Sequence, residues 1–168
     1  MPVPEPAPEI AIVPYAPAHH DRVAALVLGI QNGEFGDKIT YEQQLDLVDP
    51  GAFFGERGGA FWVALAGTEV VGTVGLIDVG SRCAGLRKMF VRADMRGAPL
   101  NIAQRLLDMV LDHARGHGFQ WIYLDTIDAF RAAHRFYAKN GFEEIGREAL
   151  PPGFPYLPGA SKFFRIGL

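Results

Sequence analysis

The sequence predicts a mixed α/β (α+β) fold in which a central mixed, largely antiparallel sheet is flanked by helices. Apolar residues make up 49% of the 168-residue chain, which is enough for a packed core. The patterning gives, in order, a strand, two helices, three strands, a helix, a strand, a helix and two strands. No internal repeat is visible. We therefore expect one domain over residues 9–168, after a flexible tail at 1–8 that is rich in Pro and Glu.

The first half of the chain contains the first strands and two helices. Residues 10–16 alternate in polarity and predict a strand, and apolar residues at helical spacing then predict a helix that ends at Asn32-Gly33. Thr40, with Gln43 three residues later, predicts the N-cap of a second short helix. Two strands follow around a tight turn at 66–68, and residues 84–92 predict a third.

The second half is organised by a long amphipathic helix over about 101–116. Its apolar residues fall on one stripe that should pack on the sheet: Ile102, Ala103, Leu106, Leu107, Val110, Leu111 and Ala114. Residues 121–126 predict a strand, and residues 128–139 predict a helix that Asn140-Gly141 ends. The last two strands should flank a Pro-rich loop at about 150–160.

Composition excludes several classes of function. The net charge is −3 and no block of Lys and Arg occurs, so we expect no nucleic-acid partner. The apolar runs are too short to span a bilayer, and the N-terminus does not read as a signal peptide, so we expect no membrane partner. One cysteine, Cys83, excludes an internal disulfide and fits the reducing cytoplasm; its place at a strand edge favours a buried, inert thiol.

The stretch "MRGAPLNIAQRLLD" (95–108) combines an Arg-Gly pair, a proline and the start of the long helix. The free N–H groups of a first helical turn, together with the helix dipole, favour an anion. Arg96 could add a charge-assisted contact to such an anion. The same residues also fit a plain connection from strand to helix with a solvated arginine.

The segment from "MFVRADMRGAPLNIAQRLLD" through "FQWIYLDT" resembles the acetyl-CoA-binding core of the GNAT superfamily of N-acetyltransferases. That family carries R-G-x-G-I-[GA]-x-x-L-L here. Aligning "NIAQRLL" with "GIAxxLL" keeps the helix in phase, puts Asn101 in the place of the family's glycine and lengthens the loop by about two residues. "AAHRFYAKNGFEEIG" (132–146) resembles the family's last signature, and the likeness runs from about residue 60 to the end.

The resemblance implies a sheet that splays between the strands at about 84–92 and 120–126, with the pantetheine arm of acetyl-CoA between them. It also implies a cofactor site in which the first strand and the loop bind through backbone groups. The implied residues are Met89, Phe90 and Val91 for the arm and acetyl carbonyl, Thr126 and Phe136 for its other side, and Arg96, Gly97, Ala98, Asn101, Ile102 and Ala103 for the pyrophosphate. Asn is among the non-glycine residues that best adopt the left-handed conformation such a loop requires.

Tyr137 matches the family position for the acid that protonates the departing thiolate. The alternative is that Tyr137 only packs with Phe136 under the sheet. The base that takes the amine's proton is open, because Gly85 stands where many relatives have a Glu. Glu34, Asp78, Asp125 or a water chain could serve instead.

The resemblance implies acetyl transfer from acetyl-CoA to a primary amine of a small molecule, or of a peptide or protein terminus, by direct transfer. Two alternatives remain: a non-catalytic acyl-CoA-binding or interaction module of the same fold, and an acyltransferase that uses a longer acyl-CoA. The acceptor site should lie between the N-terminal helices and the 150–160 loop. We expect no metal, because no Cys or carboxylate cluster joins the pairs His19-His20 and His113/His117. Relatives are often dimers, so a homodimer is left open.

Overall fold

The computed structural model describes the chain except residues 35, 37, 38, 57, 156 and 158. The described residues form a seven-stranded sheet in the order β1-β2-β3-β4-β5-β7-β6. Within it, β4 and β5 are parallel, and the other neighbours are antiparallel. The strands are β1 (Ile10–Pro14), β2 (Ala60–Ala66), β3 (Glu69–Gly80), β4 (Cys83–Val91), β5 (Trp121–Thr126), β6 (Glu143–Ile145) and β7 (Lys162–Gly167). The predicted fold class is confirmed.

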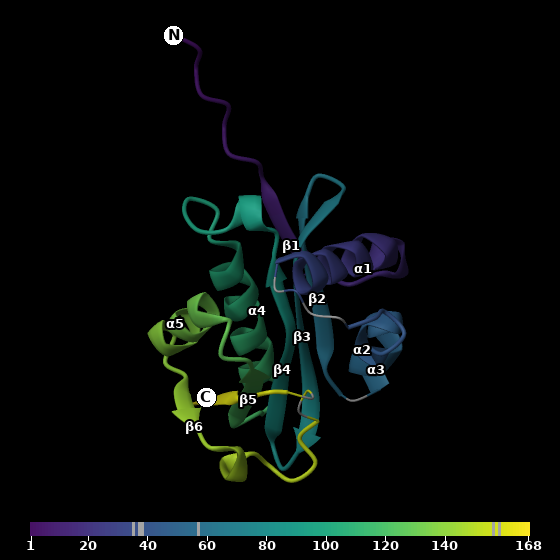
Figure 1. The fold of residues 1–168 in the computed structure, drawn as a ribbon, viewed down its shortest axis with the longest axis vertical. Coiled ribbons are helices and arrows are strands. Elements are labelled where there is room, and N and C mark those ends of the chain that lie inside the picture. The colour runs from purple at the N-terminus through teal and green to yellow at the C-terminus, as the bar shows by residue number, and fades with distance from the viewer. Residues whose placement is uncertain (35, 37–38, 57, 156, 158) are drawn as a thin grey trace.

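Helices cover both faces of this sheet (Figure 1). One face carries α1 (His20–Leu28), α2 (Leu45–Val48) and α3 (Pro50–Glu56), and the other carries α4 (Ile102–Gly116) and α5 (Arg131–Lys139). The core divides in the same way, because one buried cluster joins the sheet to α4 and α5 and another joins it to α1, α2 and α3. Short turns of other helix types are Pro17–His19, Gly29–Glu34, Ala93–Met95 and Arg147–Ala149.

The parallel strands β4 and β5 pair only at one end. Cys83, Ala84 and Gly85 pair with Trp121, Ile122 and Tyr123 in turn. Beyond these pairs β4 runs on to Val91 and β5 to Thr126 without a ladder between them. The two strands therefore splay apart as expected, and their open edges carry backbone groups that an extended ligand can pair with.

Strand β4 also contains a β-bulge inside the splayed part. Thr73 of β3 pairs with Phe90 and Gly75 pairs with Arg87, so two residues of β4, Lys88 and Met89, lie opposite one residue of β3. Lys88 has a φ of 50°. Its carbonyl oxygen accepts a 2.7 Å hydrogen bond from the buried Thr73 hydroxyl. The bulge changes the faces to which the following side chains point.

The long helix α4 packs as its apolar stripe predicts. Five residues of the stripe are buried: Ile102, Leu106, Leu107, Val110 and Ala114. Ala103 and Leu111 are partly buried against the same cluster. Burial of this stripe fixes the rotation of α4 on the sheet, and thereby the direction in which the free N–H groups of its first turn point.

Two local predictions need correction. Thr40 does not cap a helix: its N–H donates to Oε1 of Gln43 at 2.9 Å, but the following helices are α2 and α3, and α2 has no side-chain cap. The first helix does not run uniformly to Asn32-Gly33, because it widens to a π-helix over Gly29–Glu34. The prediction for Cys83 is confirmed, since its thiol is buried and burial raises the pKa of that thiol.

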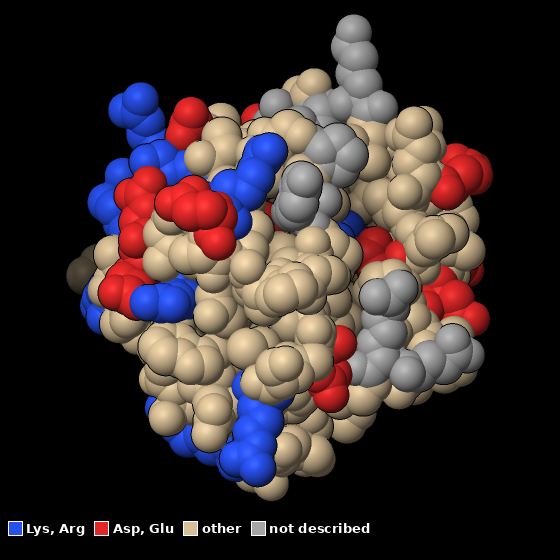
Figure 2. Space-filling view, turned by 90° about the horizontal axis from the view of Figure 1, so that it is seen from below, with Lys and Arg blue, Asp and Glu red and all other residues tan. Residues whose placement is uncertain are grey.

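Both signs of charge occur on the surface. Figure 2 shows Lys, Arg, Asp and Glu side by side on the face seen from below. Ion pairs of this kind join β6 to β7, where Lys162 contacts Glu144 at 3.0 Å and Arg165 contacts Glu143 at 2.6 Å. In the described part of the chain, no helix is long and apolar enough to span a bilayer.

Candidate functional site

The loop before α4 has the shape that an anion site requires. Asn101, at the N-cap, is left-handed with φ 49° and ψ 44°, and Gly97 has a φ of 79°. The Asn101 N–H donates to Gly97 O at 3.0 Å, and the Arg105 N–H makes a helical hydrogen bond to Asn101 O at 3.0 Å. The N–H groups of residues 102–104 precede that helical bond, so they are the donors of the first turn. Asn101 thus takes the conformation that glycine usually supplies.

Arg96 is tied to neighbouring groups. Its Nε donates to Val91 O at 2.8 Å, and its Nη2 donates to Oε2 of Glu34 at 2.8 Å, with a second bond from Nη1 to Oε1. The guanidinium therefore has its charge balanced by Glu34. The hydrogen bonds from Arg96 lower the pKa of the Glu34 carboxyl, so Glu34 is ionised and paired.

Tyr137, on α5, reaches the splayed part of β4. Its ring is 7% exposed and packs against Phe136, Phe142 and Phe164 at centroid distances of 5.7, 5.4 and 6.0 Å. Its hydroxyl donates to Sδ of Met89 at 3.8 Å. Burial, and secondarily the charge of Asp125, raise the pKa of Tyr137 well above its ordinary value. The phenol is therefore protonated at every ordinary pH.

The remaining cofactor residues surround the splay. Met89 packs with the cluster on the α4–α5 face, whereas Phe90 packs with the cluster on the opposite face. Thr126, at the end of β5, is buried, and its carbonyl oxygen accepts the Ser161 N–H at 3.0 Å. Of the residues expected at the arm, the structure brings Met89 and Tyr137 into direct contact.

A family model described as the acetyltransferase (GNAT) family matches residues 26–142, which is more than half of the chain. The chain belongs to the GNAT acetyltransferase family. An acetyltransferase of the GNAT family from Staphylococcus aureus Mu50 has a TM-score of 0.90 at 36% identity, covering 95% of this chain and 99% of that one. The PaiA N-acetyltransferase from Thermoplasma acidophilum, solved in complex with coenzyme A, has a TM-score of 0.74 at 12% identity, covering 95% and 99%, and shares the fold.

Among curated proteins, N-acetyltransferase 8B of Rattus norvegicus is 33% identical over 101 residues. That match covers 57% of this chain and 45% of the rat protein. The chain thus spans about half the length of the N-acetyltransferase 8 relatives that it matches.

Gly85, the strand position where the resemblance implies a Glu, is tightly surrounded by side chains. A Cβ at Gly85 would lie 3.2 Å from Cγ1 of Ile77 and 3.3 Å from Cε2 of Phe154. Both distances are tighter than ordinary contacts, and Phe154 comes from the loop before β7. Phe154 therefore lies beside β4 where a carboxylate on this strand would need space.

The three carboxylates expected as alternative bases differ in their surroundings. Glu34 is paired with Arg96, and Oδ1 of Asp78 accepts the Gly80 N–H at 2.8 Å. Oδ2 of Asp125 accepts the Leu157 N–H at 2.5 Å. Of the three, Asp125 is the one whose charge acts on Tyr137, raising the pKa of that phenol. Among these three carboxylates, Asp125 is therefore the one with an electrostatic effect on the Tyr137 hydroxyl.

A charged cavity on the α1–α3 side of the sheet was missed by reading the sequence. It is lined by Gln43, Gln44, Leu45, Asp46, Phe53, Arg87, Lys88, Pro155 and Leu157. These residues come from the segment that includes α2, from α3, from β4 and from the loop before β7. The N-terminal helices and this loop are the elements expected from the sequence to flank the acceptor. Tyr156, in the same loop, lies outside the described residues. The N-terminal third carries no recognisable motif, so no signal in the sequence singles out Asp46.

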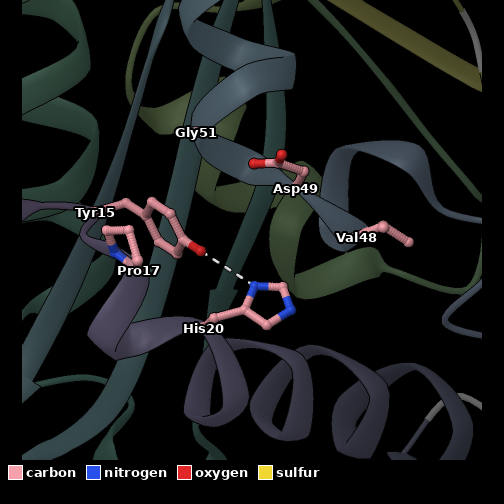
Figure 3. Close-up of a pocket in the computed structure, with 6 residues that line it drawn as sticks. All are labelled: Tyr15, Pro17, His20, Val48, Asp49 and Gly51. Carbon is pink, nitrogen blue, oxygen red and sulfur yellow. Dashed lines mark hydrogen bonds between the residues drawn. The ribbon is translucent and has the colours of Figure 1, made fainter.

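A second cavity, shown in Figure 3, opens on the outer side of α1 and α2–α3. His20 lies in it between two phenols, with Nδ1 3.1 Å from the Tyr15 hydroxyl and Nε2 2.8 Å from the Tyr41 hydroxyl. Its lining includes Tyr15, Val48 and Asp49 but, among described residues, none from β4 or β5. This cavity therefore does not adjoin the splay.

The other histidines expected to be solvated form a stack. The rings of His113 and His117 lie 3.9 Å apart, and His113 also contacts Trp62 at 5.0 Å. Within the described ranges, no group of three or more His, Cys, Asp or Glu side chains is arranged to hold a metal ion.

Proposed function

We propose that this protein is an N-acetyltransferase that moves the acetyl group of acetyl-CoA to a primary amine of a small molecule, or of a peptide or protein terminus, by direct transfer. Membership of the GNAT family supports this class of activity. The observation that carries the proposal is the contact between the Tyr137 hydroxyl and Met89, in the part of β4 beyond its ladder with β5. A phenol beside the splayed strands fits the proposed role of Tyr137 as the acid.

The proposed cofactor site has two parts. The open backbone of Met89, Phe90 and Val91 would pair with the pantetheine arm and orient the acetyl carbonyl, with Thr126 and Phe136 on the other side. The free N–H groups at the start of α4, among them those of Ile102 and Ala103, would hold the pyrophosphate, in a loop whose shape is set by Gly97, Ala98 and Asn101. The left-handed Asn101 fits this role. Arg96 would join them only by exchanging Glu34 for a phosphate.

The chemistry needs two proton movements. Acetyl-CoA supplies an acyl group on a thioester, which the nitrogen lone pair of the acceptor attacks as the C–S bond breaks. Tyr137 gives its phenolic proton to the departing sulfur, and its raised pKa keeps that proton in place beforehand. Asp125, directly or through water, receives the proton that the acceptor nitrogen loses. Asp125 then releases its proton to solvent and Tyr137 takes one up from solvent, which restores both groups for the next turnover.

The test is a thiol-release assay with acetyl-CoA against a panel of amines, run with calorimetry of CoA binding. Amine-dependent release of CoA with an acetylated product supports the proposal. If CoA binds but no amine gives turnover, the protein is a binding module and the proposal fails. Faster turnover with propionyl- or butyryl-CoA than with acetyl-CoA would replace the acetyl group by a longer acyl group.

A further inference from the structure

Three buried charges meet on the acceptor side of the sheet. Oδ2 of Asp46 lies 3.2 Å from Nζ of Lys88 and 3.7 Å from Nη2 of Arg87. The side chains of Asp46, Arg87 and Lys88 are 5%, 9% and 4% exposed. Charged side chains are rarely buried to this degree unless they are paired. The three together leave one positive charge in excess.

The bulge in β4 is what brings the two cations together. Consecutive residues of a regular strand point to opposite faces, so Arg87 and Lys88 should not reach one carboxylate. The extra residue at Lys88, with its φ of 50°, turns both side chains towards Asp46. Because the bulge brings two cations together in a buried place, these side chains are part of a defined site and not of a solvated surface.

The cluster has donors to spare. Asp46 Oδ2 accepts no well-aligned hydrogen bond from any described residue. Arg87 uses Nη1 on the carbonyl oxygen of Pro155, which leaves further N–H groups of its guanidinium. Lys88 has three donors on its ammonium. Because Arg87 and Lys88 both line the cavity, N–H groups that they do not use on Pro155 or Asp46 can donate to an acceptor on a bound molecule.

The cavity at this cluster, of about 210 Å³, is lined by Arg87 and Lys88, which lie in the part of β4 beyond its ladder with β5. Lys88 immediately precedes Met89, which contacts the Tyr137 hydroxyl. The side chains of Leu45 and Leu157, 71% and 37% exposed, form part of the lining. Leu157 in turn donates its N–H to Asp125, the proposed proton acceptor. A small molecule in the cavity would therefore reach from Arg87 towards Asp125.

We propose that Arg87, supported by Lys88 and Asp46, binds a carboxylate of the acceptor, so that the substrate is a small amine that also carries a carboxylate. The inference rests on the proposed acetyltransfer. A planar guanidinium fork matches a carboxylate. The positive charges of Arg87 and Lys88 attract the carboxylate of the substrate, whereas Asp125, whose charge also acts on Lys88, is the group proposed to take the proton of the amine. Asp46 keeps Arg87 and Lys88 in position and prevents two cations from facing each other unpaired.

The experiment compares matched pairs of acceptors at saturating acetyl-CoA. The probes are glycine, β-alanine, 4-aminobutanoate and leucine, each against its own primary amide. For at least one spacing, we expect kcat/KM for the carboxylate to exceed that of its amide by about 10- to 100-fold, the usual worth of a hydrogen-bonded charge. An amide's amine is the weaker base and is more available as free amine, so availability alone would favour the amides.

The Arg87→Gln variant should lose that preference, mainly through KM, and Arg87→Lys should restore part of it. Arg115→Gln, the same change at an exposed site on α4, is the control and should leave the preference intact. Equal or better use of the amides at every spacing would overturn the inference while leaving acetyl transfer intact. A preference that survives in a folded Arg87→Gln variant would also overturn it. No turnover with any of these probes, despite CoA binding, would overturn this inference, whereas the amine panel described above decides separately whether the protein transfers acetyl groups at all.

Discussion

The two sides of the splayed sheet are built by different means. On the α4–α5 side, the proposed CoA site consists of an open strand edge, the first turn of a helix and one phenol. On the α1–α3 side, the proposed acceptor site consists of charged side chains buried around a bulge. Apart from the Tyr137 phenol, the first side depends on backbone shape and tolerates any side chain that preserves this shape. The second depends on particular side chains, which can change with the substrate.

Removing the Tyr137 hydroxyl tests the first side most severely. Tyr137→Phe should lower kcat about 100- to 1,000-fold, because it removes the acid, while the ring keeps its packing. CoA affinity should stay within about twofold, since the hydroxyl has no assigned role in binding. Tyr15→Phe, which also removes a phenol but lies in the outer cavity, should leave kcat unchanged. Assays of kcat and calorimetry decide, and a kcat within threefold of the parent would show that Tyr137 only packs.

The pH profile sharpens that test. Burial raises the pKa of Tyr137 above its ordinary 10.0, so the phenol stays protonated up to and beyond that pH. We therefore expect that ionisation of Tyr137 does not lower kcat below pH 10. Any alkaline decline of kcat below that pH should persist in Tyr137→Phe. An alkaline limb centred near neutral pH and removed by this substitution would contradict the assignment.

Removing the carboxylate of the charge cluster tests the second side through the free energy of unfolding. Asp46→Asn leaves Arg87 and Lys88 buried without their carboxylate, and should lower the free energy of unfolding by about 3 kcal/mol in urea titrations. Asp112→Asn, at an exposed site on α4, is the control and should change it by less than about 0.5 kcal/mol. Adding Lys88→Met to Asp46→Asn should recover part of the loss. A loss below about 1 kcal/mol would mean that water reaches and solvates the cluster.

The loss in Asp46→Asn should also depend on pH. Burial lowers the pKa of Lys88 from its ordinary 10.5, and Asp46 opposes that shift. Without Asp46 the folded state favours neutral Lys88 more strongly, so the penalty is full at low pH. It should shrink as pH rises through the lowered pKa towards 10.5, where the unfolded chain also loses the proton. A penalty that grows over that range would contradict this role of Lys88.

Substitutions at Asn101 separate backbone shape from side-chain chemistry in the CoA loop. Asn101→Gly should keep CoA affinity within about twofold, because glycine adopts the same left-handed conformation. Asn101→Val should weaken it about tenfold, since a β-branched residue there is strained by about 1–2 kcal/mol. Calorimetry with CoA measures both. Equal affinities for Val and Gly would show that the loop does not need this conformation.

The smallest effect is expected at the Arg96–Glu34 pair. Glu34→Gln frees the Arg96 guanidinium and should tighten CoA binding about two- to threefold at low salt. Stability should change by no more than about 0.5 kcal/mol, because the pair is partly exposed. The gain should vanish in the Arg96→Gln background. A gain that persists without Arg96 would remove this residue from the proposed phosphate site.

The same contrast explains how much the sequence could predict. The apolar stripe on α4 and the phase of "NIAQRLL" predict where the helix begins, because helical periodicity is a local property of the sequence. The resemblance then puts Asn101 where a glycine usually stands, and the structure shows Asn101 in the left-handed conformation. The charge cluster was invisible because Asp46 and Arg87 lie 41 positions apart and meet only through a bulge that no local pattern marks. The sequence leaves Glu34 open as a candidate base, because it does not show that the Glu34 carboxylate pairs with Arg96, a residue far away in the chain.

The most direct test of the whole account is a crystal structure with bound CoA. We expect the pyrophosphate on the N–H groups at the start of α4, next to Asn101. The sulfur should lie within about 3.5 Å of the Tyr137 hydroxyl, between β4 and β5. The charged cavity at Arg87 should remain free of CoA. A sulfur remote from Tyr137, or a pyrophosphate bound away from residues 97–104, would contradict the division of the sheet into a backbone-built cofactor side and a side-chain-built acceptor side.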